Sequence, residues 1–313
     1  MCRVFVVVVT YNGEKWVDYC FGSLSKSTIP IETVVVDNGS DDDTVEKIKT
    51  QYPDVTVIEA GSNLGFGKGN NRGMEYALSN GADYLFLLNQ DAKIEPETIE
   101  KLVQKQSNNP NIGVLSPIHL NGDGEALDFK FAKFHMPPNK CKGLISDLYL
   151  NNDTDKVYEA TTLNAAAWLI SRKCLKKVGG FHPLFDHYGE DDNFLQRLFY
   201  SGFKAGIYPE TVIYHDRDDR STNSYFKSSY KSRKRDLLKT LTNPNLSDQK
   251  KRVYKQLRWY LISSIFRFKT DQVRENYRLL QDLKFYNKEI ERLGNAVKSD
   301  YPFLNLHNDS PER

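Results

Sequence analysis

The stretch Tyr84-Leu85-Phe86-Leu87-Leu88-Asn89-Gln90-Asp91 decides the fold. Its apolar residues have the length of one buried β-strand, and the run ends in an amide and a carboxylate, Asn89 and Asp91. Residues i and i+2 of a strand project to the same face, so both side chains are expected to reach one point just past the strand. In a parallel α/β sheet, ligands bind at this carboxyl end, and a carboxylate there can hold Mg²⁺ or Mn²⁺. A surface turn with two polar residues is the alternative.

Strand and helix patterns alternate along the first half of the chain. Continuous apolar runs predict buried strands, and apolar residues at helical spacing predict the helices between them. The expected strands are 4–9, 31–37, 55–60, the stretch from Tyr84, and 112–117. The expected helices are 15–26, one capped by Ser40, 68–80, and one that begins at Pro96. This β-α-β order predicts right-handed crossovers and an α/β fold with a doubly wound, mostly parallel sheet.

The second half is less regular. Residues 121–162 are expected to form a loop-rich insertion, followed by a strand at 163–171, a helix at 190–200 and a strand at 205–215. Beyond about Arg220 the pattern is helical, basic and aromatic to about Lys298, and the last fifteen residues are expected to be frayed. We therefore expect one domain over residues 1–220 and a mostly helical extension over residues 221–313.

The composition is that of a globular protein. Its 313 residues can form one large domain with an extension, and 39% of them are hydrophobic, which excludes a disordered chain. No stretch approaches the ~18 apolar residues of a membrane span, and Val4–Val9 is too short for a signal peptide. The four cysteines form no C-x-x-C pair, so they indicate neither a zinc site nor a disulfide framework. A reducing, cytoplasmic location is expected.

The net charge of +2 conceals an uneven distribution. Arg217 to Lys298 contains 21 Lys and Arg residues against 9 Asp and Glu, a net of +12, whereas the remainder has 22 against 32, a net of −10. A basic tail on an acidic body indicates an anionic partner for the tail. Within 249–269, apolar residues recur at helical spacing: Val253, Leu257, Tyr260, Leu261, Ile265 and Phe268. Such a helix can lie on an anionic membrane, or its apolar stripe can pack on the domain expected over residues 1–220.

Several short motifs lie at expected strand ends. Gly65–Gly73 follows a strand as a phosphate-binding loop would, yet it matches neither the Walker A pattern nor G-x-G-x-x-G, and helix packing explains its glycines equally well. Asp37 ends the second strand, and Thr10-Tyr11-Asn12 ends the first, so both are expected beside Asp91. Convergence of three polar strand ends favours a nucleotide site over three separate helix caps.

Two further motifs lie later in the chain. Glu190-Asp191-Asp192 occupies the first turn of an expected helix, where acidic residues also serve simply to complement the helix dipole. His215 ends the last expected strand, where on its own a packed or surface histidine is the simpler interpretation.

Taken together, these motifs resemble the family 2 glycosyltransferases of the GT-A fold. The matching stretches, in order, are 10–12, 36–42, 63–73, 87–91, 180–181, 190–191 and residue 215, which together span about the first 220 residues. Each motif is short, and the ordered set carries the likeness. Asn89-Gln90-Asp91, in place of the commoner D-x-D, is similar to the rhamnosyltransferase-like branch.

The resemblance implies roles for the matching positions. It places Asp191 as the base that deprotonates the acceptor, with Glu190 beside it in the catalytic site. It places Asp91 on a divalent metal, Mg²⁺ or Mn²⁺, with His215 as a further ligand. The implied nucleotide-sugar site comprises Thr10, Tyr11, Asn12, Asp37, Gly67, Asn71 and Asn89. Trp168 is implied at the acceptor.

The sequence departs from the family pattern at two positions. Asn89 replaces the first Asp of D-x-D, so either the metal has one carboxylate fewer or Asn89 contacts the sugar. Asn193 stands where a second acid often follows the Glu-Asp pair, so the resemblance assigns no role to that position.

The sequence thus predicts an inverting, metal-dependent glycosyltransferase. The expected donor is a UDP or dTDP sugar, with rhamnose a candidate, and the expected acceptor is a saccharide or lipid-linked saccharide in surface polysaccharide assembly. Peripheral contact with an anionic membrane is a further expectation, and no nucleic acid partner is expected.

Two alternatives to this prediction remain. A nucleotidylyltransferase would carry a phosphate loop rich in glycine and basic residues after the first strand, where Thr10-Tyr11-Asn12-Gly13 stands instead. A non-catalytic protein that binds anionic lipid or nucleic acid would be built around the basic tail. RNA binding would normally show stacking aromatic residues on a sheet face, as in an RNP-type motif, and the sequence contains no such motif.

Overall fold

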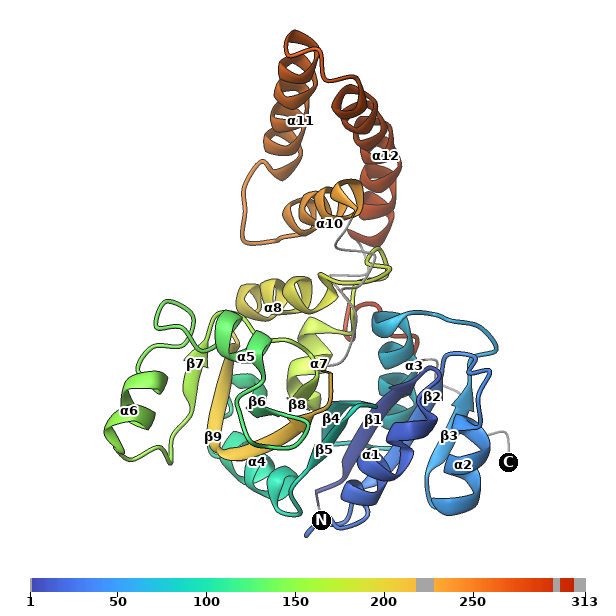
Figure 1. The fold of residues 1–313 in the computed structure, drawn as a ribbon, viewed down its shortest axis with the longest axis vertical. Coiled ribbons are helices and arrows are strands. Elements are labelled where there is room, and N and C mark those ends of the chain that lie inside the picture. The colour runs from blue at the N-terminus through green and yellow to red at the C-terminus, as the bar shows by residue number, and fades with distance from the viewer. Residues whose placement is uncertain (1, 218–227, 295–298, 307–313) are drawn as a thin grey trace.

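The computed structural model of this chain describes residues 2–217, 228–294 and 299–306. Within these residues, nine strands form one sheet in the order β3-β2-β1-β4-β8-β6-β9-β5, and β7 pairs with β9. Helices cover the sheet, and three C-terminal helices project from it (Figure 1). The strands are β1 (Val4–Thr10), β2 (Glu32–Asp37), β3 (Thr56–Glu59), β4 (Tyr84–Asn89), β5 (Ala92–Ile94), β6 (Ile112–Asn121), β7 (Tyr158–Ala160), β8 (Ala167–Ser171) and β9 (Lys204–His215).

The helices follow the strands in the expected alternation through the first half of the chain. Up to residue 217 they are the 3-10 turn η1 (Glu14–Trp16), α1 (Val17–Leu24), α2 (Thr44–Gln51), α3 (Phe66–Ser79), α4 (Thr98–Ser107), α5 (Phe129–Phe134), α6 (Leu144–Leu150), α7 (Arg172–Val178) and α8 (Glu190–Tyr200). The C-terminal helices are α10 (Ser229–Leu241), α11 (Gln249–Phe266) and α12 (Thr270–Gly294).

The sheet is parallel where the sequence alternates strand and helix, and mixed beyond that point. β3, β2, β1 and β4 pair in parallel, as do β6 and β9. β8 inserts between β4 and β6 and is antiparallel to both. The central strands are buried on both faces: Val6 and Val8 pack in one apolar core, and Phe5 and Val7 pack in the other. A strand that is covered by helices on both faces has a continuous run of apolar residues, and this explains the apolar run at 4–9. The predicted α/β fold is confirmed.

Two glycines of α3 bring this helix close to β1. A Cβ atom added to Gly69 would lie 2.9 Å from Val9 Cγ1, and one added to Gly73 would lie 2.4 Å from Val7 Cγ1. Neither position has room for a larger side chain unless the helix moves. Close packing of helix on strand therefore accounts for these two glycines of the 65–73 motif.

The structure differs from the sequence-based expectation in the 121–162 region. That region is not only loop, because it contains α5, α6 and β7. The strand β5 and the helix α7 were also not expected. Each of these elements has ten residues or fewer, so apolar periodicity has too few positions to reveal it.

The chain end also differs from expectation. Residues 299–306 are not frayed, because they pack back on the N-terminal domain. The amide of Gly180 donates to the carbonyl of Pro302 (2.8 Å), and the amide of Tyr301 donates to the carbonyl of Lys176 (2.8 Å). The ring of Phe303 lies against the buried Arg197 guanidinium. The predicted domain boundary at 220/221 and the expected helix end near 298 lie outside the described residues.

The close approach of α3 to β1 predicts the effect of enlarging a glycine. Gly73→Ala should lower the free energy of unfolding by about 1–3 kcal/mol, because the added methyl group overpacks the contact with Val7. Urea denaturation followed by circular dichroism measures this change. Ser79→Ala, at an exposed position near the end of the same helix, is the matched control and should leave stability nearly unchanged. Equal stability of the Gly73 variant and the control would contradict the packing explanation.

Candidate active site

A cavity of about 650 Å³ opens at the carboxyl ends of β1, β2 and β4. Its lining comes from the residues that end these strands and begin α3, together with a later segment: Val9, Thr10, Tyr11, Asn12, Trp16, Asn38, Asn63, Gly65, Phe66, Asn89, Gln90, Asp91, Asp186 and His187. The convergence of polar strand ends expected from the sequence is therefore present. This is the position at which doubly wound sheets bind ligands.

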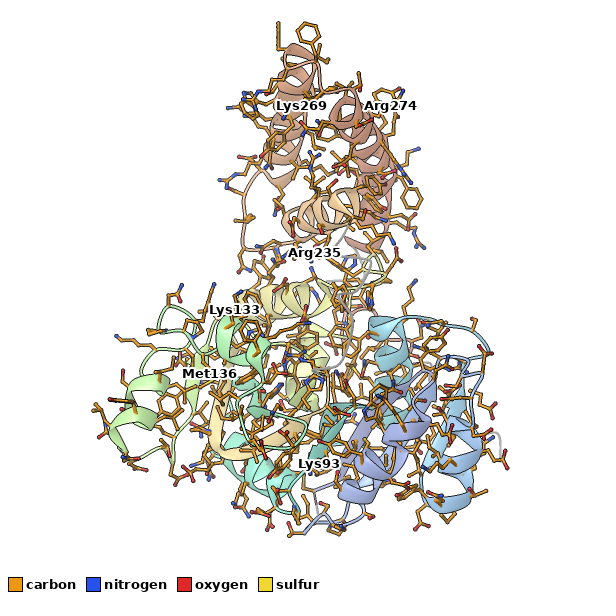
Figure 2. All side chains as sticks on the ribbon, viewed as in Figure 1. Lys93, Lys133, Met136, Arg235, Lys269 and Arg274 are labelled. Atoms are coloured by element: carbon orange, nitrogen blue, oxygen red, sulfur yellow. The ribbon has the colours of Figure 1, made fainter. Side chains whose placement is uncertain are left out.

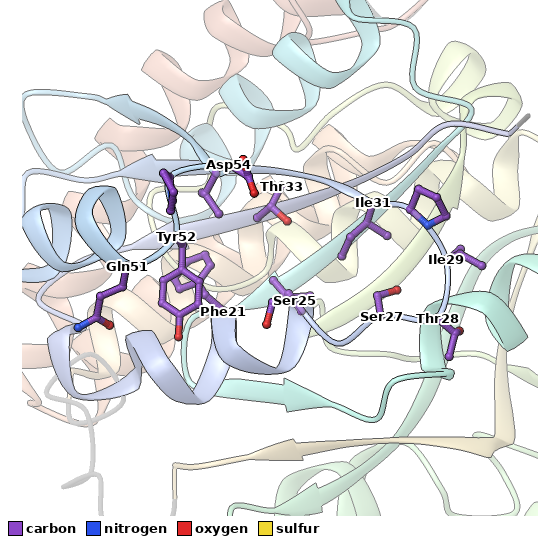
Figure 3. Close-up of a pocket in the computed structure, with 14 residues that line it drawn as sticks. Phe21, Ser25, Ser27, Thr28, Ile29, Ile31, Thr33, Gln51, Tyr52 and Asp54 are labelled. Atoms are coloured by element: carbon purple, nitrogen blue, oxygen red, sulfur yellow. The ribbon is translucent and has the colours of Figure 1, made fainter.

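A second hollow of about 680 Å³ lies at the opposite ends of the strands. It is lined by residues that precede or begin β2 and β3, among them Ile31, Thr33 and Asp54, and by Phe21 of α1 (Figure 3). None of the residues singled out from the sequence lines this hollow. The carboxyl-end cavity is thus the candidate active site, and we call it the strand-end cavity.

Asp37 does not line the strand-end cavity, but it holds the ends of the two strands that do. Its buried carboxylate accepts hydrogen bonds from Thr10 Oγ1 (2.9 Å) and from the backbone amides of Gly39 (3.0 Å) and Ser40 (2.9 Å). The Ser40 hydroxyl donates to the same group (2.5 Å). Asp37 therefore fixes the turn after β2 and ties it to the end of β1. A nucleoside contact by Asp37 stays a prediction.

The loop after β1 is held by two side-chain amides. Asn12 adopts a left-handed backbone with φ of 47°, a conformation that asparagine tolerates better than most residues, and its Oδ1 accepts from the amide of Asp41 (2.8 Å). Gln90 bridges β4 to β1, because its Oε1 accepts from the amide of Tyr11 (2.9 Å) and its Nε2 donates to the carbonyl of Tyr11 (3.1 Å). The middle residue of Asn89-Gln90-Asp91 thus braces the cavity wall.

Asp91, Asn89 and His215 meet at the edge of the cavity. His215 Nε2 lies 3.4 Å from Asp91 Oδ2 and 3.4 Å from Asn89 Nδ2, and the His215 and Asp91 side chains are almost fully buried. The short strand β5 produces this meeting, since its antiparallel pairing with β9 sets Ala92 opposite His215. The backbone adds a further tie, because the amide of Asp216 donates to the carbonyl of Asp91 (2.8 Å).

His215 is supported from behind by a buried carboxylate. Asp128 Oδ2 lies 3.8 Å from His215 Nδ1 and accepts from Arg217 Nε (2.6 Å). Burial alone would raise the pKa of Asp128, but its hydrogen bond to Arg217 and the charge of that guanidinium outweigh burial, so the pKa is lowered. Asp128 also caps α5, accepting from the amide of Phe131 (2.7 Å). An ionised Asp128 thus faces one ring nitrogen of His215 while Asp91 faces the other.

This donor set is compatible with a divalent cation. Carboxylate, imidazole and amide groups are ligands that Mn²⁺ accepts, and a carboxylate with substrate phosphates suits Mg²⁺. Among the described residues, however, no three His, Cys, Asp or Glu side chains gather into a metal-binding group. Asp91, His215 and Asn89 therefore fit a metal whose remaining ligands come from the diphosphate and water.

The first turn of α8 places three carboxylates in different surroundings. Glu190 is almost fully buried, with Oε2 lacking a hydrogen-bond partner among the described residues, and an added Cβ on Gly67 would lie 3.7 Å from Glu190 Cβ. Asp191 is partly exposed. Asp192 pairs with Lys239 of α10 (2.9 Å). Asp186 lines the strand-end cavity just before this turn, so α8 begins close to its rim.

The surroundings of this turn alter the acidity of two carboxyl groups. Burial raises the pKa of Glu190 well above its ordinary value, and the charge of Asp191 adds to the shift. Although Asp191 is partly exposed, loss of water around its carboxyl group raises its pKa, and the charge of Asp192 adds to the shift. Raised pKa values of carboxyl groups in a turn beside a cavity are typical of groups that exchange protons.

Five of the twelve expected site residues line the cavity, and Asp37, His215, Glu190, Asp191, Gly67, Asn71 and Trp168 do not. The last three are held by packing or hydrogen bonds elsewhere. Gly67 packs against Phe181, since an added Cβ would lie 3.1 Å from Phe181 Cβ. Both ends of the Asn71 amide bind the backbone of Phe181: Nδ2 donates to its carbonyl (2.8 Å) and Oδ1 accepts from its amide (2.7 Å). Trp168 has no exposed surface and packs between Phe181 and Phe194. In this structure, contact between an acceptor and Trp168 is excluded by that burial.

Sequence reasoning missed several residues of the site. Trp16, Asp186 and His187 line the cavity, Gln90 braces it and Asp128 supports His215. Gln90 and His187 lay within or beside motifs that the sequence offered. The sequence did not indicate a role for Asp128, because this residue lies in the irregular 121–162 region.

Fold and site together define an α/β protein with a doubly wound sheet and a cavity at the carboxyl ends of its strands. The family model of glycosyl transferase family 2 matches residues 5–179, more than half of the chain. This chain belongs to glycosyltransferase family 2. The nucleotidylyltransferase and the non-catalytic binding protein are accordingly not favoured.

Among curated proteins, relatives named as rhamnosyltransferases are similar to this chain. The N-acetylglucosaminyl-diphospho-decaprenol L-rhamnosyltransferase of Mycobacterium tuberculosis is 26% identical over 253 residues, which cover 72% of this chain and 81% of that protein. The dTDP-rhamnosyl transferase RfbF of Shigella flexneri is 26% identical over 70% of this chain and 71% of its own length. The likeness to the rhamnosyltransferase branch is thus confirmed.

Solved structures share the fold. Staphylococcus aureus TarS in complex with UDP-GlcNAc aligns with a TM-score of 0.53 at 20% identity, over 79% of this chain and 68% of that one. The mannosyltransferase PcManGT of Pyrobaculum calidifontis, in complex with GDP-Man and Mn²⁺, aligns with a TM-score of 0.57 at 16% identity, over 94% of this chain and 80% of that one. At these identities the comparison establishes the fold.

The raised pKa of Glu190 predicts a pH-dependent loss of stability. Above about pH 4.5, the ordinary pKa of glutamate, the carboxyl group ionises in the unfolded chain but stays protonated in the folded one. Stability is therefore fully present below that pH and is lost as the pH rises through the folded pKa. Glu190→Gln stays neutral throughout, so from pH 4.5 to 8 it should lose less unfolding free energy than the wild type, by at least about 1 kcal/mol.

Urea unfolding at a series of pH values measures this difference. Glu46→Gln, at an exposed position of α2, is the control and should follow the wild-type pH profile. Parallel profiles for Glu190→Gln and the wild type would mean that burial does not shift the Glu190 carboxyl group.

Proposed function

We propose that this glycosyltransferase moves a sugar, with inversion, from a nucleotide diphosphate donor to a lipid-linked saccharide in surface polysaccharide assembly. The observation that most directly supports this proposal is the strand-end cavity, which has the Asp91–His215 pair at one edge and the acidic turn of α8 beside it. The relatives named as rhamnosyltransferases, one of them a dTDP-rhamnosyl transferase, support dTDP-rhamnose as the first donor to test, with UDP sugars as the alternative.

The donor is proposed to bind along the carboxyl ends of the strands. Thr10, Tyr11 and Asn12 would contact the nucleoside where β1 ends, and Asn89 would contact either the sugar or the metal. The Asp37 and Gln90 hydrogen bonds hold this wall before the donor arrives. A wall that is already fixed loses less conformational entropy on binding.

A divalent metal, Mg²⁺ or Mn²⁺, is proposed to be held by Asp91 with help from His215. When bound, it would neutralise the negative charge that develops on the departing diphosphate. Asp128 lies 3.8 Å from His215 Nδ1, beyond hydrogen-bond distance, and would act on the ring by its charge while Nε2 faces Asp91. Support of a histidine ligand by a buried carboxylate is a common arrangement in metal sites.

Asp191 is proposed as the base that takes the proton of the acceptor hydroxyl. Of the three acids in the turn, Asp192 is engaged by Lys239 and Glu190 is buried, whereas Asp191 is partly exposed and has a raised pKa. A base whose pKa lies nearer to neutral pH removes a proton more effectively than an ordinary aspartate. A single in-line displacement assisted by such a base inverts the anomeric centre.

The acceptor is proposed to be delivered at a membrane surface on the cytoplasmic side. None of the described helices is both long and apolar enough to cross a membrane. Peripheral contact through the basic C-terminal helices would bring the cavity to a lipid-linked acceptor.

The metal proposal predicts the behaviour of an Asp91 variant. Asp91→Ala should abolish nearly all sugar transfer, and Mn²⁺ should no longer enhance the thermal shift produced by a dTDP or UDP sugar, because the anchoring carboxylate is gone. Thermal shift across a panel of UDP, GDP and dTDP sugars, with and without Mn²⁺, measures donor choice and metal dependence together. Titration of Mn²⁺ followed by electron paramagnetic resonance gives a readout independent of turnover.

Asp123→Ala, at an exposed loop position, is the control and should retain the wild-type response. Full transfer activity of the wild type in excess chelator would rule out a metal-dependent reaction.

The base proposal predicts a separation of binding from transfer. Asp191→Asn keeps the shape of the side chain and removes its basicity, so donor affinity should survive while transfer falls by roughly 10²–10⁴-fold. Initial rates and donor binding are measured on the same preparation. Nuclear magnetic resonance of the product reports whether the anomeric configuration is inverted.

Asp192→Asn is the matched control in the same turn and should transfer at close to the wild-type rate. If Asp191→Asn stays active while Glu190→Gln does not, the base is Glu190 and the assignment to Asp191 is wrong.

A further inference from the structure

The C-terminal helices have a small apolar core of their own. Leu241 of α10, Val253 and Leu257 of α11, and Leu279 and Leu283 of α12 are buried together. Val253 and Leu257 belong to the stripe that the sequence offered for contact with a membrane, so that stripe does not lie on a surface as one unit. The exposed apolar residues of α11 are different ones and lie toward its C-terminal end.

A second group of apolar side chains is exposed at the far end of the helical hairpin. Phe266 is 78% exposed and Phe268 is 92% exposed. We call the exposed residues around the α11–α12 turn the hairpin tip: Trp259, Ile262, Ile265, Phe266, Arg267, Phe268, Lys269 and Arg274. The α11–α12 turn lies at the end of the molecule farthest from the sheet, and Lys269 and Arg274 mark it (Figures 1 and 2).

The apolar residues of the tip lie on one side of α11. Trp259, Ile262 and Phe266 are spaced i, i+3 and i+7, which places them on a single face of a helix. The other side of α11 carries the buried Ser264, whose hydroxyl accepts from Asn276 Nδ2 of α12 (3.3 Å). The apolar face thus points away from the hairpin's own packing, and no described element covers it.

The net positive charge around the tip indicates which kind of partner it can bind. Residues 258–278, which include the tip, contain five Lys and Arg and two acids, Asp271 and Glu275, a net of +3, and four more basic residues lie at the other end of α11. Glu275 is paired with Arg233 of α10 (2.7 Å), and Asp271 lies 3.9 Å from Arg274. A second copy of this surface would bring like charges together, whereas anionic lipid headgroups complement them. Aromatic side chains flanked by basic ones are typical of segments that insert into the headgroup region of a membrane.

We propose that the hairpin tip docks on an anionic lipid bilayer, with Trp259, Ile262, Phe266 and Phe268 inserted among the headgroups. Arg267, Lys269 and Arg274 contact the lipid phosphates. The end of the hairpin and the outer face of α11 make this contact, and the inner face of α11 stays packed in the helical core. Delivery of a lipid-linked acceptor by this contact rests on the proposed function, but the binding itself does not.

Vesicle co-sedimentation of the full chain tests the docking. The wild type should bind vesicles that contain phosphatidylglycerol at least tenfold more tightly than pure phosphatidylcholine vesicles, and added salt should weaken the difference. Phe266→Ser combined with Phe268→Asn should lower binding to anionic vesicles by at least tenfold, because two inserted rings are lost. Asn is chosen at 268 because that residue has a φ of 53°. Arg267→Glu combined with Lys269→Glu should remove the preference for anionic lipid.

The matched control is a pair of exposed apolar residues outside the C-terminal helices. Tyr149 and Leu150, at the end of α6, are 84% and 62% exposed, and Tyr149→Ser combined with Leu150→Asn should bind vesicles as the wild type does. Equal wild-type binding to neutral and anionic vesicles, or unchanged binding by the Phe266 and Phe268 variant, would overturn the proposal. So would a concentration-dependent dimer, seen by sedimentation velocity, that this variant abolishes while the wild type binds no vesicles.

A donor-binding assay separates this proposal from the proposed function. The tip variants should bind nucleotide sugar as the wild type does, and should lose transfer to an acceptor embedded in vesicles while keeping transfer to a water-soluble one. Vesicle binding in a protein that transfers no sugar would refute the proposed function and leave the docking surface intact.

Discussion

The antiparallel pairing of β5 with β9 is the constraint on which the candidate active site depends. It sets Ala92 opposite His215 and so brings Asp91, which immediately precedes Ala92, to 3.4 Å from the histidine ring. A shift of one residue in this register would turn His215 to the other face of its strand. The pair therefore exists because two strands distant in sequence share one register. A site built on strands in this way is held more rigidly than one built on loops.

The glycine-rich segment after β3 connects the cavity to the rest of the fold. Its first glycine, Gly65, has a φ of 79° and begins α3 at the cavity wall, a conformation that a larger residue adopts only with strain. Gly69 and Gly73 let α3 approach β1. Asn71, between them, binds the backbone of Phe181. The start of this segment therefore lines the cavity, and the rest of it packs against β1 and Phe181. This division explains why its pattern resembles a phosphate-binding loop without matching one.

How much the sequence predicts depends on the length and burial of each element. Strands such as β1 and β4 are buried on both faces, and their apolar runs indicate both their existence and the polar residues that follow. A three-residue strand such as β5 has no periodicity, so the partner that brings His215 to Asp91 could not be derived from its own residues. Trp168 illustrates the converse case, because nothing in its neighbours reveals that it packs between two phenylalanines. Helical spacing likewise predicted an apolar stripe on α11 but could not reveal which part of that stripe a neighbouring helix covers.

The C-terminal helices contribute to the electrostatics of the acidic turn as well as to its packing. Asn193 Nδ2 donates to Thr242 Oγ1 (2.9 Å), which holds the end of α10 against α8. Lys239, three residues earlier, reaches Asp192 at 2.9 Å and lowers the pKa of Asp191 by its charge, while burial and Asp192 raise it. Burial outweighs the lysine, so the carboxyl group of Asp191 keeps a raised pKa. A displacement of α10 would withdraw the lysine and raise that pKa further. The helices that carry the hairpin tip are thus physically connected to the residue proposed to deprotonate the acceptor.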